Sequence, residues 1–118
     1  MIQMDNTNPD LKSLHNNLIG IVSNLNDALN AATDLDTIIA IATEISEVNH
    51  RVTLVGNLLF TQETQNITSA IQNVNDAIAD VQESIQQIQS VTDTVNALSS
   101  FLALVDNAID IAKLIPSA

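Results

Sequence analysis

A repeating hydrophobic seam runs through the C-terminal part of this chain and constrains its fold more than any other feature. Between Ile67 and Ile115, aliphatic residues recur every three or four positions, which places them on one side of an α-helix. They are Ile67, Ile71, Val74, Ile78, Val81, Ile85, Ile88, Val91, Val95, Leu98, Leu102, Val105, Ile109 and Ala112. A stripe of this kind is stable in water only when other helices cover it. The sequence therefore predicts an all-α fold of packed helices.

The seam has one irregular step. The spacing alternates between four and three until Ile88, and then a second step of three leads to Val91. Ser90 and Asp93 beside this step match a capping box, which begins a helix. A turn at 90–94 would divide the seam into two helices, whereas one continuous helix of ~50 residues would span about 75 Å. We favour the turn, because a monomer would leave much of a continuous seam uncovered, although an oligomer could bury it.

Two more helices are predicted in the N-terminal half. Asn8 can cap a helix whose first residue is Pro9, a position where the missing proline N–H costs nothing. Thr33 and Asp36 form a second capping box, with Thr33 as the expected N-cap. A heptad seam follows each start. The first comprises Leu11, Leu14, Leu18, Ile21, Leu25, Ala28 or Leu29, and Ala32; the second comprises Ile38, Ile41, Ile45, Val48, Val52, Val55 and Leu59.

These signals predict an antiparallel four-helix bundle with helices near 9–32, 34–60, 63–90 and 93–115. The alternative is a helical hairpin packed on one long helix of ~50 residues in an oligomer. Residues 1–7 lack periodicity and are predicted to form a disordered N-terminus. Residues 8–118 are expected to form a single helical-bundle domain.

Composition argues against several classes of function. The 118-residue chain has 14 acidic and 3 basic residues, which gives a net charge of −11. Nucleic acids and anionic membranes attract clustered Lys and Arg. We therefore expect no nucleic-acid partner, and a membrane is compatible with the apolar content but disfavoured by the charge. No signal peptide or transmembrane segment is visible, so the sequence assigns no compartment.

The sequence holds no recognisable motif for catalysis, a cofactor or a metal. It has no Cys and only 2 Gly, which leaves no thiol chemistry and no glycine-rich phosphate loop. Glu47 and His50 have the spacing used in carboxylate-bridged metal bundles, but they lie off the seam and are expected to be exposed. Asp76, Asp80 and Glu83 share a helix face and are expected to contact water. We therefore expect a non-enzymatic protein without a cofactor or metal site.

The last helix has the broadest apolar surface. From Leu98 onward the stripe widens to include Phe101 and Leu104, whereas the stripe over 67–88 is narrow and typical of an edge helix. A mean hydropathy of +0.21 also indicates apolar surface in excess of a core. The residues expected to contact a protein partner are Leu98, Phe101, Leu102, Leu104, Val105 and Ile109.

These features favour an interaction or assembly module that acts through amphipathic helix–helix packing and associates with itself or with another protein. Two alternatives stay open. A bundle whose apolar surfaces open could bind lipid or form a pore, in spite of its charge. An acidic chain could also serve as an inhibitor or immunity-type protein for a basic partner, through charge complementarity.

Overall fold

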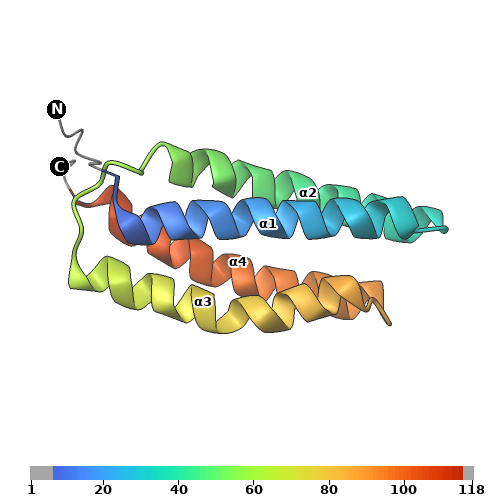
Figure 1. The fold of residues 1–118 in the computed structure, drawn as a ribbon. Coiled ribbons are helices and arrows are strands. Elements are labelled where there is room, and N and C mark those ends of the chain that lie inside the picture. Colours follow the sequence, from blue (N-terminus) through green and yellow to red (C-terminus); the bar gives the residue numbers. More distant parts are fainter. Residues whose placement is uncertain (1–6, 116–118) are drawn as a thin grey trace, which may run out of the picture.

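The computed structural model describes residues 7–115, which form four helices. These are α1 (Pro9–Ala31), α2 (Leu35–Gly56), α3 (Gln65–Gln86) and α4 (Val91–Lys113), and successive helices run in opposite directions (Figure 1). The predicted all-α antiparallel four-helix bundle is confirmed, and the chain turns at 87–90 instead of continuing as one long helix. The bundle measures 52 × 29 × 19 Å. The predicted disordered segment 1–7 lies, apart from Thr7, outside the described residues.

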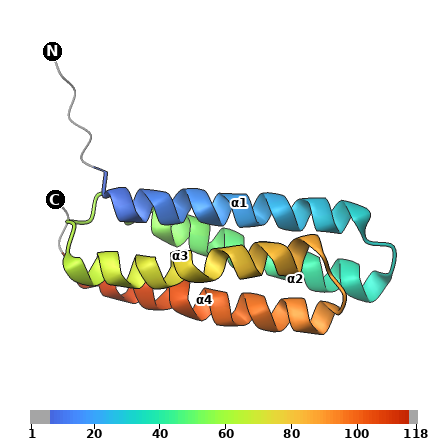
Figure 2. The same cartoon turned by 60° about the horizontal axis from the view of Figure 1, so that its bottom comes forward.

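The bundle consists of two helical hairpins packed side by side. Helix α1 contacts α2 and α3, and α4 contacts the same two helices, so α1 lies diagonally opposite α4. Residues 57–64 cross this diagonal over one end of the bundle to connect α2 with α3 (Figures 1 and 2). We call this the proximal end, and the end that carries the two hairpin turns the distal end. As a result, α1 runs parallel to α3, and α2 runs parallel to α4.

Asn8 joins the start of α1 to the crossing segment. Its side-chain oxygen accepts hydrogen bonds from the backbone N–H groups of Asp10 and Leu11, both at 3.0 Å. Its side-chain nitrogen donates to the Thr61 carbonyl at 3.1 Å, and its backbone N–H donates to the Leu59 carbonyl at 2.7 Å. Asn8 and Thr61 are both buried. The predicted N-cap therefore also anchors the connection between the two hairpins.

Most helix boundaries differ from the predicted ones by one to four residues, and three of the differences have a clear local cause. Asp34, and not Thr33, caps α2, with its side chain accepting from the backbone N–H of Thr37 at 3.0 Å. Helix α2 ends at Gly56 and not near residue 60, because the chain there tightens into turns with carbonyl acceptors three residues back. Helix α3 ends at Gln86 and not near residue 90, because Ser90 caps α4 instead. The residue that caps a helix therefore depends on the path of the preceding loop as well as on residue type.

The four seams meet in one hydrophobic core. Its fully enclosed large side chains come from all four helices, and Phe101 is the largest of them. Helix α4 contributes the broadest buried surface, as its wide stripe predicted. Its buried residues are Thr94, Leu98, Phe101, Leu102, Val105, Ala108, Ile109 and Ala112. On α3 the buried stripe is narrower, and Asp76, Asp80 and Glu83 are exposed as expected.

Gly20 lies inside α1 without a packing reason for a glycine. A Cβ atom placed there would meet no heavy atom within 4 Å, so the site does not mark a close helix crossing. We expect Gly20→Ala to raise the free energy of unfolding by about 1 kcal/mol, because Ala loses less backbone entropy in a helix. Urea denaturation of both proteins measures this gain, and a loss of stability would show that the position needs glycine.

Candidate functional site

The residues predicted to bind a partner lie inside the bundle. Leu98, Phe101, Leu102, Val105 and Ile109 are all buried, with exposed fractions of 5 % or less. Leu104, the sixth residue of the predicted set, is half-buried and packs against the core. In the closed bundle, α2 and α3 cover this surface of α4. A partner would reach it only if the hairpins separated, so a binding role for these residues stays a prediction.

Helix α4 is long and apolar enough to cross a membrane. Its 23 residues include a window with a mean hydropathy of 1.3, and it is the one helix of this kind within residues 7–115. The core helix of a water-soluble bundle has the same composition, since both must be apolar along most of their surface. The length and hydropathy of α4 therefore do not distinguish a membrane-spanning helix from the core helix of a water-soluble bundle.

A second surface lies on the outside of the α1–α2 hairpin. On each helix a line of exposed residues follows the alternating steps of four and three. On α1 they are Lys12, Asn16, Ile19, Ser23, Asn26 and Asn30, and on α2 they are Leu35, Ile39, Ala42, Ser46, Asn49 and Thr53. We call these two lines together the outer α1–α2 face.

Two contacts show that this face points away from the other hairpin. Asn17 donates to Asn75 of α3 at 3.1 Å, and Ile19, two residues further along α1, lies on nearly the opposite side of the helix. Arg51 reaches α4, and Thr53, two residues later on α2, likewise points away from α4. The outer α1–α2 face is therefore covered by no other part of residues 7–115.

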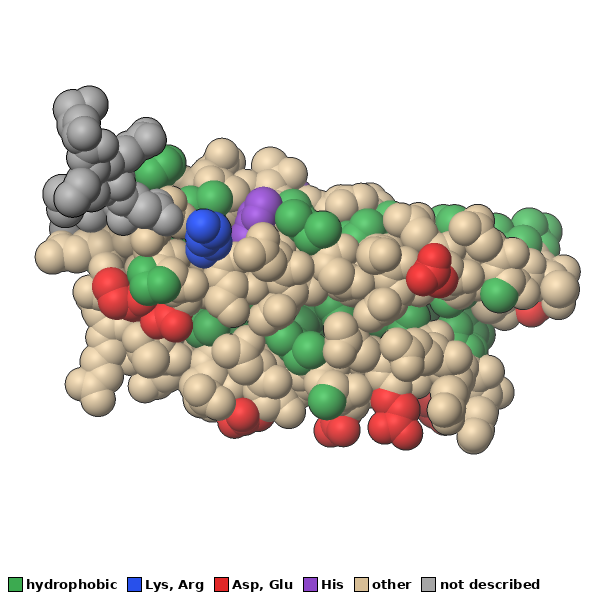
Figure 3. Space-filling model, viewed as in Figure 1, with side chains coloured by type: hydrophobic (Ala, Val, Ile, Leu, Met, Phe, Trp, Pro, Cys, Tyr) green, Lys and Arg blue, Asp and Glu red, His purple; other side chains and the backbone are tan. Residues whose placement is uncertain are grey.

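Large apolar side chains are exposed on this face. Ile19 is 47 % exposed, Ile39 is 55 % exposed and Leu35 is 69 % exposed. The twelve residues of the face include no carboxylate, although the whole chain carries a net charge of −11. Figure 3 shows part of this distribution: acidic side chains gather along the lower edge over α3 and are sparser over α1 and α2. The negative charge is thus distributed unevenly around the bundle.

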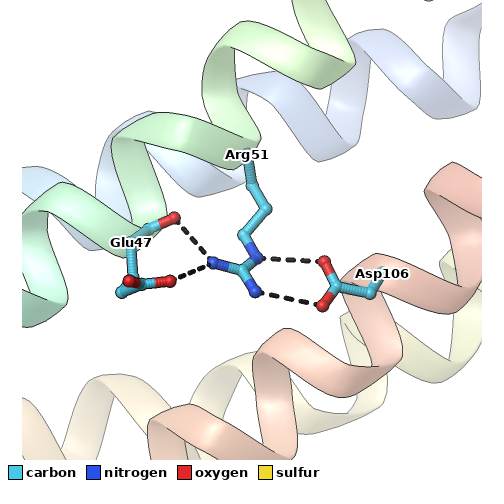
Figure 4. A network of polar contacts seen from close by, with 3 residues as sticks. All are labelled: Glu47, Arg51 and Asp106. Atoms are coloured by element: carbon cyan, nitrogen blue, oxygen red, sulfur yellow. Dashed lines mark hydrogen bonds and ion pairs between the residues drawn. The ribbon is translucent and has the colours of Figure 1, made fainter.

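An ion-pair network joins the two hairpins on the α2–α4 side. Arg51 binds Asp106 of α4 through two parallel hydrogen bonds of 3.0 Å, from Nε and from one terminal guanidinium nitrogen. The other terminal nitrogen donates to the Glu47 carboxylate at 2.8 Å and to the Glu47 carbonyl at 3.0 Å (Figure 4). The Asp106 and Glu47 side chains are about half exposed. The network is therefore worth only about 1 kcal/mol, and it links α2 of one hairpin to α4 of the other.

Glu44 lies beside this network in an open hollow of about 360 Å³ between α2 and α4. It is a buried acidic residue, 8 % exposed. Burial raises the pKa of Glu44, the neighbouring Glu47 raises it further, and Arg51 acts in the opposite direction. Because the folded-state pKa is above the unfolded one, ionised Glu44 destabilises the fold near neutral pH, and protonation relieves this penalty as the pH falls.

We expect Glu44→Gln to raise the free energy of unfolding near pH 7 and to have little effect near pH 4, where the carboxyl is largely protonated. Denaturant unfolding at both pH values measures the difference. Glu83→Gln on exposed α3 serves as the control and should change stability little at either pH. A Glu44→Gln effect of equal size at both pH values would contradict a cost that comes from ionisation.

Two carboxylates approach each other at the proximal end. The Thr68 hydroxyl donates to Asp10 at 2.7 Å and lies 3.4 Å from Glu63, whose carboxylate also accepts from the Thr64 backbone N–H at 3.1 Å. Partial burial and the neighbouring Asp10 raise the pKa of Glu63. The hydrogen bond from Thr68 to Asp10 connects the starts of α1 and α3. Within residues 7–115, no group of three or more His, Asp or Glu side chains is placed to hold a metal ion.

The distal end has a further hollow of about 410 Å³ between the two hairpin turns. Small and aliphatic side chains form much of its lining, including Ala28, Ala32, Ile85, Ile88 and Val91. Asp34 is the one acidic group in this lining, and it already caps α2. The lining also includes the polar side chains of Thr33, Thr37, Gln86 and Gln89, so the hollow has a mixed polar and apolar surface.

The outer α1–α2 face is the surface that sequence reasoning missed. Ile19, Leu35 and Ile39 lie off the inward-facing seams and were not assigned to any surface. The available signal was that these residues share a four-and-three spacing with neighbours that include no acid, in a chain with many acids. The Arg51–Asp106 pair had no such signal, because the two residues are 55 positions apart.

Comparison with known proteins shows no relative: no family model, no curated protein and no solved structure matches this chain.

Proposed function

We propose that this chain is a non-enzymatic helical assembly module that associates with itself through helix–helix packing. The observation that carries the proposal is the outer α1–α2 face. The inward seams are already covered within the bundle, yet Ile19, Leu35 and Ile39 are still about half exposed or more. Apolar side chains exposed on one face that lacks carboxylates are typical of a surface that another protein covers.

The polar groups of the bundle support a structural role more than a catalytic one. Arg51 could hold an anionic substrate, but all three nitrogens of its guanidinium group already donate hydrogen bonds to Asp106 or Glu47. Asn8 is fully used as a cap and an anchor. The hollow beside Arg51 is open to solvent on the surface of the bundle, whereas substrate sites are usually concave and largely enclosed.

Light scattering coupled to size-exclusion chromatography tests the proposal. We expect the measured mass to rise above the 12.6 kDa monomer as the protein concentration increases. Added salt should promote this association, because it screens the repulsion between two copies that each carry −11. A monomer at every concentration, with no protein partner, would contradict the proposal. Association with a basic protein that collapses in salt would instead favour the inhibitor alternative.

A lipid-binding function is the second candidate, and helix α4 is the observation in its favour. Its length and mean hydropathy of 1.3 would suit a membrane once the hairpins separate. Co-flotation with neutral phosphatidylcholine vesicles and release of an entrapped dye test this function. Binding with dye release would support it, and the absence of both would contradict it.

A further inference from the structure

We infer that the outer α1–α2 face is the surface on which a second copy of this chain sits, in a face-to-face dimer. The inference rests on the proposed self-association and adds the site and the partner. A two-fold arrangement brings the same patch of both molecules together, so that the apolar side chains of one copy cover those of the other. Each of the next three observations favours this face over the remaining surface of the bundle.

The distribution of acidic residues favours the outer α1–α2 face as the dimer surface. Two copies with a net charge of −11 repel each other wherever carboxylates are brought together. The α3 side is unsuitable, since Asp76, Asp80 and Glu83 are all exposed there. On the α1–α2 hairpin, the exposed acids belong to neither line of the outer face, although two of them flank Leu35 at its distal end; they are Asp27, Asp34, Asp36 and Glu47. The outer α1–α2 face thus lets two copies meet with Lys12 as the one charged side chain within the face itself.

The size of the face suits a dimer. Helix α1 has 23 residues and α2 has 22. At ~1.5 Å per residue and an interaxial distance of roughly 10 Å, two such helices present a surface of roughly 650 Å². Stable protein interfaces bury ~800 Å² on each partner. One helical hairpin is therefore close to the area that a stable dimer needs.

The composition of the face also suits self-association. Three large aliphatic residues share the face with Lys12 and with mostly small or amide side chains, including Ala42 and Ser46. Small residues let helix backbones approach closely, and Asn side chains can both donate and accept hydrogen bonds, so identical faces can pair without unsatisfied groups. A partner selected by charge would instead call for a charged surface. A second copy fits because a face of apolar, small and amide side chains, with Lys12 as its one charged residue, can complement itself.

A matched pair of variants tests the inference. Ala42 lies on the outer α1–α2 face, and Ala79 lies on the exposed surface of α3, so Ala42→Asp and Ala79→Asp make the same chemical change at exposed helical positions. We expect Ala42→Asp to raise the dimer Kd by about thirtyfold or more, as for a residue at the centre of an interface. Ala79→Asp should change Kd by less than about threefold. Analytical ultracentrifugation measures both constants, and circular dichroism checks that both variants fold.

Ile39→Ser is a second variant, which removes apolar surface without adding charge, and it should also weaken the dimer. The outcomes distinguish a failure of the proposed self-association from a failure of the proposed dimer face. A wild-type chain that stays monomeric overturns both the self-association and this face. A dimer that tolerates Ala42→Asp and Ile39→Ser, or one that is weakened equally by Ala79→Asp, overturns the face and leaves the assembly function standing.

Discussion

Replacing Phe101 with alanine is expected to lower the free energy of unfolding by about 3–5 kcal/mol. Phe101 is the largest enclosed side chain of the bundle and is 1 % exposed. Its truncation removes the free energy of burying an aromatic ring and leaves a cavity in the hydrophobic core. Guanidinium denaturation followed by circular dichroism measures the loss.

Leu114→Ala provides the control on the same segment of chain, since Leu114 is 87 % exposed. Its effect should stay within about 0.5 kcal/mol. The comparison also tests the sequence-based prediction that Phe101 contacts a partner. If Phe101→Ala abolished association and left stability unchanged, the α4 surface would be a binding site and the closed bundle would be wrong.

Replacing Asn8 with alanine is expected to cost about 3 kcal/mol, the second-largest effect. The variant loses the cap of α1, which contributes about 0.5–2 kcal/mol in other helices. It also removes the donor to the buried Thr61 carbonyl, and an unsatisfied buried group costs about 1–3 kcal/mol. Urea denaturation measures the total.

Asn8→Ser separates the two contributions. Serine caps helices well but is too short to reach Thr61, so this variant should lose only part of the stability that Asn8→Ala loses. Equal losses in the two variants would show that the cap contributes little and that the anchor of the crossing segment dominates. A negligible loss of stability in both variants would contradict a stabilising role for the hydrogen bonds that join Asn8 to residues 57–64.

The energetics of opening favour assembly through the outer α1–α2 face over a lipid-bound state. Exposing the five large apolar side chains that are buried on α4 would cost on the order of 10 kcal/mol, which is comparable to the whole stability of a small domain. A membrane would have to replace all of these contacts. By contrast, Ile19, Leu35 and Ile39 are exposed in the closed bundle, and their association requires no opening.

The parts of the structure that were predictable from the sequence are local or periodic. The helical seams, the turn near Ser90 and the caps Asn8 and Ser90 depend on residues within a few positions of each other. A spacing of three and four selects a helix whatever surrounds it, and Asn and Ser satisfy helix N–H groups by their own geometry. The same reasoning correctly turned Asp76, Asp80 and Glu83 toward water.

The tertiary structure alone decided which stripes are covered and which stay open. Because the crossing segment leads from α2 to the diagonal helix, α4 packs between α2 and α3, and its broad apolar surface is used inside the bundle. The same arrangement brings Arg51 to Asp106, and it leaves Ile19 and Ile39 without a covering helix. A repeat in one chain shows that a helix has an apolar side, but the arrangement of its neighbours determines whether that side is core or interface.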